Sequence, residues 1–234
     1  MLKPILLTIT LLAVLFNTAS MAKTNWSSPS FTYLNGSGYE LGDNHRQIIT
    51  FEYASANSWG DMFLFMDRAE SSNGDNSTYS EVSPRIHITA FELGVIENLY
   101  FTPVAEFGPE TNWLAGLGTD LKIPYFQYAK LSLYYKDNGD GDSSEQLTLS
   151  WAIPLYENIL VDGFIDVMGS YQKDNGFTSA SSINATSQLK YNLASYLGLD
   201  TPLYVGIEYV HWNSKYGVAG VDERNVNALV KYHF

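Results

Sequence analysis

The sequence predicts an all-β protein, a transmembrane antiparallel β-barrel of about twelve strands that follows a cleaved signal peptide. Three observations predict this fold. The N-terminus has the pattern of an export signal. Apolar residues occupy every second position through most of the remaining chain, which is the period of a β-strand. The polar connections tend to alternate between short and long, as they do in barrels of the bacterial outer membrane.

The export signal has the three parts of a signal peptide. Lys3 supplies a positive charge, the stretch from Pro4 to Phe16 is almost entirely apolar, and small residues lead up to Ala22. We predict cleavage after Ala22, which leaves residues 23–234 as a single barrel domain and residues 1–22 as the signal peptide. An N-terminal anchor is the alternative, but the apolar stretch is short for a spanning helix and no stop-transfer pattern follows it.

The composition narrows the function classes. The chain has no cysteine, which excludes thiol catalysis, cysteine-based zinc sites and disulfide chemistry. A net charge of −12 argues against binding a nucleic acid polymer, since that requires a basic face. Aromatic residues make up 15% of the chain and charged residues only 16%, which favours a surface that presents aromatic rings to a membrane interface.

The alternation divides the chain into strands and connections. The expected strands are 26–34, 46–54, 59–67, 79–91, 98–107, 113–121, 127–137, 146–155, 160–170, 186–195, 203–210 and 226–234. The long polar connections, expected outside the cell, are 35–45, 68–78, 138–145, 171–185 and 211–225. The shorter connections, expected in the periplasm, are 55–58, 122–126 and 156–159. The 108–112 connection is short where a long one is expected.

The last expected strand has one apolar face and ends in the aromatic residue Phe234. Such a strand suits the closing position of a barrel, with its terminal ring at the membrane interface. We therefore expect the barrel-assembly machinery, outer-membrane lipid and lipopolysaccharide to be its partners. The last strand of a soluble sheet is the alternative.

Alternation also predicts which side chains face the lumen, because a membrane barrel is apolar outside and polar inside. The candidate lumen residues are Asp61, Phe63, Phe65, Asp67, Glu81, Arg85, Lys130 and Tyr134. Aromatic rings in a lumen could stack on a nucleobase while carboxylates accept hydrogen bonds from ribose hydroxyls. Packing of a narrow interior is the alternative for the rings. Ion pairing of Arg85 with Glu81, Asp61 or Asp67 is the alternative for the charges.

Three stretches resemble the Tsx-like nucleoside channels, a family that includes the OmpK outer-membrane proteins. They are the aromatic strand between two aspartates at Trp59–Asp67, the Pro-Arg strand at Glu81–Ile88, and the Gly-rich strand at Gly116–Asp120. The resemblance is best over residues 46–137. It implies a narrow twelve-stranded barrel of the Gram-negative outer membrane that passes nucleosides or similar small polar solutes passively, without a cofactor or metal.

Two other functions stay open from the sequence. A plugged barrel could act through its loops as an adhesin or phage receptor, and a barrel-borne hydrolase could assemble a catalytic site in space. An enzyme is not expected, because none of His45, His87, His211 and His233 lies in a local motif with a nucleophile. The acidic run at 137–142 lacks the ligand spacing of a calcium loop.

Overall fold

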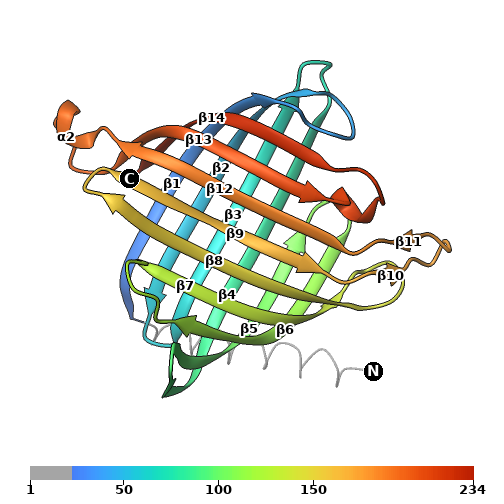
Figure 1. Ribbon diagram of the computed structural model, residues 1–234, viewed down its shortest axis with the longest axis horizontal. Helices are drawn as coiled ribbons and strands as arrows, with labels where there is room; N and C mark the ends of the chain where they lie inside the picture. The colour runs from blue at the N-terminus through green and yellow to red at the C-terminus, as the bar shows by residue number, and fades with distance from the viewer. Residues whose placement is uncertain (1–22) are drawn as a thin grey trace, which may run out of the picture.

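The computed structural model describes residues 23–234, so the predicted signal peptide at 1–22 lies outside the described residues. The described chain forms a closed antiparallel barrel of twelve strands (Figure 1). Their order around the wall is β1-β14-β13-β12-β9-β8-β7-β6-β5-β4-β3-β2, in which each strand pairs with its sequence neighbours in the barrel and β1 closes on β14. The predicted fold class is confirmed.

The barrel strands all lie where alternation predicted a strand, with shifted ends. They are β1 (Thr24–Ser37), β2 (His45–Asn57), β3 (Gly60–Ser71), β4 (Asn76–Leu93), β5 (Ile96–Phe107), β6 (Thr111–Leu121), β7 (Tyr128–Asp137), β8 (Ser144–Tyr156), β9 (Ile159–Met168), β12 (Ser182–Asn192), β13 (Leu203–Asn213) and β14 (Glu223–His233). The connections hold a small hairpin of β10 (Tyr171–Gln172) and β11 (Thr178–Ser179), the helix α2 (Ala194–Leu197) and the 3-10 turn η1 (Lys215–Gly217).

The outer wall is apolar because one residue in two along each strand points away from the interior. A continuous row of paired, exposed apolar side chains crosses the wall from β4 to β12. Its members are Ile86, Phe101, Leu117, Leu133, Leu147, Val167 and Ile183. Such a row is unfavourable in water and favourable in a lipid bilayer, where a closed barrel also satisfies its backbone hydrogen bonds internally.

The two ends of the barrel carry different connections. The C-terminus and α2 lie at one end, and the β10–β11 hairpin lies at the other (Figure 1). At the hairpin end, the predicted 68–78 connection is shorter than expected, since β3 continues to Ser71 and β4 begins at Asn76. Alternation runs on through these polar residues, so polarity alone did not mark the strand ends.

At the opposite end, the predicted strand 186–195 stops at Asn192, because the chain turns into α2 at Ala194. No helix in the described residues is long and apolar enough to span a membrane.

The seam of the barrel is formed by the first and last strands. β1 pairs with β14 in an unbroken register from Ser30–His233 to Ser37–Val226. At the end of this seam, the rings of Phe31 and Phe234 stack with their centroids 5.6 Å apart. The last strand therefore occupies the closing position that the sequence predicted.

Candidate functional site: the barrel interior

The interior is identified by contacts between strands that are not neighbours in the wall. Lys130 Nζ on β7 lies 3.1 Å from Asp61 Oδ1 on β3, although β4, β5 and β6 separate these strands in the wall. Their side chains can meet only through the lumen. The structure thus places both residues on the inner face, and residues at even spacing along each regular strand share that face.

Arg85 is the centre of the interior contacts near Asp61. Its Nη1 donates to Asp61 Oδ2 at 3.1 Å and its Nη2 donates to Asp120 Oδ1 at 2.7 Å. The guanidinium lies 4.0 Å from the ring centroid of Tyr100, whose hydroxyl donates to Asp120 at 2.7 Å. We call Asp61, Arg85, Asp120 and Lys130 the β3–β7 charge cluster.

The sequence predicted the ion pair of Arg85 with Asp61 but not its ion pair with Asp120. Of the three acids offered to Arg85, the structure pairs it with Asp61 and leaves Asp67 and Glu81 outside its ion pairs. Asp120 belongs to the Gly-rich stretch that carried the family resemblance, yet it was not a candidate lumen residue. Its even spacing from the inward-facing Gly116 and Gly118 was the available signal.

The predicted aromatic residues form a short row beside this cluster. The ring centroids of Phe63 and Phe65 are 5.9 Å apart, and Phe65 is 5.6 Å from Tyr79 on β4. We call these three residues the aromatic row. Phe63 remains 37% exposed, which is high for a side chain on the inner face of a barrel. A solute in the lumen could therefore contact this ring.

Further ion pairs cross the inner face away from the β3–β7 charge cluster. Lys231 of β14 pairs with Glu52 of β2 across the intervening β1. Lys136 Nζ lies 2.8 Å from Glu106 Oε2, and these residues sit on β7 and β5. Lys190 Nζ of β12 lies 2.5 Å from Asp162 Oδ2 of β9. These pairs brace the barrel from within.

Four carboxylates of the inner face have no lysine or arginine within ion-pair distance in the part of the chain that the structure describes. Each accepts a hydrogen bond from an uncharged side chain instead. The pairs are Asp67 with Thr50 at 2.6 Å, Glu81 with Ser83, Asp166 with Thr148 at 2.5 Å, and Glu208 with Gln188 at 2.8 Å. The interior therefore has more carboxylates than those that pair with lysine or arginine.

Tyr134, the last of the predicted lumen residues, is packed among apolar side chains. Only 8% of its surface is exposed, and it clusters with Val104 and Leu114 on the inner face. Gly116 stands opposite it on β6, where an added Cβ would lie 2.9 Å from Tyr134 Cδ1. The glycine leaves room for the ring to lie against the wall, so Tyr134 fills the interior in this structure.

At the hairpin end of the barrel, Asp43 joins two connections. It accepts hydrogen bonds from the backbone N–H of Asn73 at 2.8 Å and from the hydroxyl of Ser72. The hydrogen bond from Ser72 is the main cause that lowers the pKa of Asp43 to about 2. The charged form of this carboxylate therefore links the β1–β2 and β3–β4 connections.

Within residues 23–234, no group of three or more histidine, aspartate or glutamate side chains is arranged to hold a metal ion. The charged residues of the interior are instead engaged with one another or with neutral donors, as described above.

An apolar outer wall around a charged interior, closed by twelve strands, is the architecture of an outer-membrane β-barrel. In particular, the fold is similar to that of the porin NanC, with a TM-score of 0.59 and 12% identity over 87% of this chain and 98% of that one. It is also similar to the KdgM porin, solved in complex with disordered oligogalacturonate, with a TM-score of 0.51 and 12% identity over 88% and 99% of the two chains. No protein-family model and no curated protein matches the chain.

Proposed function

We propose that this protein is a channel of the Gram-negative outer membrane that lets small polar solutes diffuse through its lumen. The observation that carries the proposal is the pairing of charged side chains across the interior, with the Lys130–Asp61 contact as its clearest case. Apolar side chains on the outside are favourable when lipid surrounds the barrel, and charged side chains on the inside are favourable when water fills it. The predicted signal peptide supports export to that membrane.

We further propose that nucleosides are among the solutes, because the aromatic row lies beside carboxylates. Phe63 offers an exposed ring for stacking, and Asp67 on the same face, which has no ion-pair partner among the described residues, offers an oxygen to sugar hydroxyls. The resemblance to the Tsx-like channels supports the same solute class. Nucleoside passage therefore rests on this chemistry and on that resemblance.

A plugged barrel is the second candidate, and deep burial of some interior side chains favours it. The side chain of Lys190 is 2% exposed and that of Lys136 is 10% exposed. A lumen filled by side chains this deeply buried would block the passage of solutes. Only the loops would then interact with other molecules, as in an adhesin or a phage receptor.

Liposome swelling tests the channel against the plugged barrel. Purified folded protein is placed in liposomes loaded with an impermeant polymer, and the swelling rate is followed in isosmotic uridine, ribose or glucose. We expect swelling with uridine at a rate at least equal to that with ribose, because stacking offsets the larger size of the nucleoside. Rates equal to those of protein-free liposomes for every solute would reject the channel.

A further inference from the structure

The mouth of the barrel at the hairpin end contains a cation enclosed by aromatic rings. Lys215 Nζ lies 5.0 Å from the ring centroid of Trp212, 5.2 Å from that of Tyr216 and 5.7 Å from that of Tyr39. All three distances are within the range in which a ring face attracts a cation. Lys215 is only 3% exposed, so the rings and their neighbours nearly exclude water from its ammonium group.

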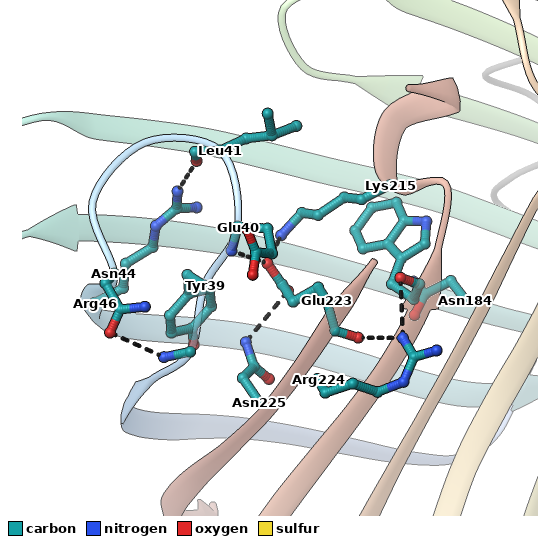
Figure 2. Close-up of polar contacts among 12 residues, drawn as sticks. Tyr39, Glu40, Leu41, Asn44, Arg46, Asn184, Lys215, Glu223, Arg224 and Asn225 are labelled. Carbon is teal, nitrogen blue, oxygen red and sulfur yellow. Dashed lines mark hydrogen bonds and ion pairs between the residues drawn. The ribbon is translucent and has the colours of Figure 1, made fainter. Parts of the chain in front are cut away.

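A buried carboxylate completes this enclosure. Glu223, which is 2% exposed, accepts a charge-assisted hydrogen bond from Lys215. It also accepts from the backbone N–H of Glu40 at 2.8 Å and from Asn225 Nδ2 at 3.2 Å. Figure 2 shows Lys215 and Glu40 converging on Glu223, with Tyr39 alongside. We call Tyr39, Trp212, Tyr216 and Glu223 the mouth cage.

The cage stands at the entrance to the lumen, since its walls are tied to the inner face of the barrel. The hydroxyl of Tyr39 donates to Asn227 Oδ1 at 2.6 Å, and Asn227 is buried on the inner face of β14. Trp212 Nε1 donates to Ser182 Oγ at 2.9 Å, which orients the indole ring. The cage therefore lies at the mouth of the barrel at the hairpin end.

The segment that carries Lys215 is held in a strained conformation. Ser214 and Tyr216 on either side have φ values of 46° and 55°, in the left-handed region that residues other than glycine rarely adopt. Backbone contacts such as Ala180 N–H to the carbonyl of Gly217 at 2.8 Å hold the turn in place. Desolvation by burial lowers the pKa of Lys215, which shows that burial works against its charge. The surrounding structure therefore keeps Lys215 buried in this turn, although the backbone strain and the desolvation of its ammonium group are both unfavourable.

We infer that the mouth cage is a binding site for organic ammonium groups, which Lys215 occupies as an internal ligand. Without Lys215, the buried carboxylate of Glu223 would have no cation partner among residues 23–234, which is unfavourable in a desolvated site. A quaternary ammonium suits the site better than a lysine ammonium, because its charge is weakly hydrated and aromatic cages recognise it readily. This inference concerns equilibrium binding and does not depend on solute passage.

Isothermal titration of folded protein in detergent with choline tests the inference. We expect Lys215→Ala to bind one choline per chain at least about tenfold more tightly than the wild type, since the variant has no internal competitor. The neutral isostere 3,3-dimethylbutanol should not bind, and adding Glu223→Gln to Lys215→Ala should abolish most choline binding. Lys173→Ala is the matched control, because Lys173 is also a lysine in an ion pair, with Glu110 and Asp140, and contributes no group to the mouth cage.

Two results would overturn the inference: a folded Lys215→Ala protein that binds choline no better than Lys173→Ala, or equal binding of choline and its neutral isostere. A second measurement uses the wild type alone and does not need the variant to fold. Acetylation of lysines by an activated ester is followed by mass spectrometry, with the exposed Lys122 as internal reference. Choline should raise the labelling rate of Lys215 relative to Lys122 several-fold, while 3,3-dimethylbutanol should not. An unchanged ratio with choline would also reject the site.

Discussion

At the scale of single residues, the interior of the barrel depends on how each charge is compensated. Arg85 satisfies two carboxylates and covers one aromatic ring, while its Nε has no hydrogen-bond partner among the described residues. For a side chain as buried as that of Arg85, which is 8% exposed, a charge that loses its partner is costly, whereas the intact pair contributes little net stability. The β3–β7 charge cluster is therefore most sensitive to removal of a single member.

We predict that Arg85→Met lowers the free energy of unfolding by about 3 kcal/mol, because it removes the main cation partner of Asp120 and one of the two partners of Asp61. Urea unfolding of the protein in detergent micelles measures this change. Lys122→Met is the control, since Lys122 is 63% exposed and its ion pairs lie in water at a barrel end. The idea fails if both variants unfold at the same urea concentration.

The aromatic row leads to a prediction about solute choice. If Phe63 and Phe65 form a stacking track, the double change Phe63→Ala, Phe65→Ala should reduce nucleoside flux relative to sugar flux. Sugar flux itself should rise or hold, because the lumen becomes wider. Permeabilities for uridine and ribose in liposomes measure the ratio. If the rings only pack the interior, both fluxes rise together or the barrel loses about 3–5 kcal/mol per ring.

Asp43 makes one loop contact dependent on pH. Its pKa is lowered from 3.8 to about 2 in the folded protein, so its contribution is fully present above pH 3.8 and is lost as the pH falls through about 2. We expect hydrogen exchange at the Asn73 amide to stay slow at pH 4 and to accelerate toward pH 2, beyond the intrinsic pH dependence of exchange. In Asp43→Asn the acceleration should be absent. A wild-type amide that is already unprotected at pH 4 would contradict this.

At the scale of elements, the strands follow from strict alternation, and the last strand closes the wall. β14 presents Val226, Val230 and Tyr232 to the outside and buries Asn227 and Lys231 inside. A one-residue slip of such a strand would exchange the two faces, so its register with β1 and β13 is strongly specified. The alternation along β14 is therefore sufficient to specify the one register in which the barrel closes.

We predict that deletion of Phe234 impairs insertion, because its ring stacks on Phe31 and is 54% exposed at the barrel surface. The yield of heat-modifiable folded protein in the outer membrane should fall. Phe177→Ala is the control, since Phe177 is a similarly exposed ring in the connection between β10 and β11. Equal yields from the two variants would remove the assembly role of the terminal ring.

At the scale of the whole molecule, the two ends of the barrel are chemically different. Connections 38–44 and 214–222 meet at the mouth cage on one end, while the C-terminus and the two-residue β2–β3 and β8–β9 turns lie at the other. Outer-membrane barrels keep short turns on the periplasmic side and longer loops outside. The mouth cage is therefore expected to face the exterior of the cell.

Cysteine labelling tests this orientation, since the chain has no cysteine of its own. We expect Asn73→Cys and Asn175→Cys to react with a membrane-impermeant thiol reagent in intact cells, because both lie in exposed connections at the hairpin end. Ser58→Cys, in the turn between β2 and β3, should react only after the outer membrane is permeabilised. Labelling of Ser58→Cys alone in intact cells would reverse the topology.

The export signal, the alternation and the loop lengths together predicted the barrel, and alternation alone predicted which residues share a face of each strand, because the side chains of a strand alternate with a period of two. Only the tertiary structure decided the partners of these side chains. Arg85 meets Asp120, two strands away, and Lys215 enters a cage built from both ends of the chain. Such contacts depend on the tilt and stagger with which the wall closes and on how long connections fold back. Neither property is visible in the period of any single strand.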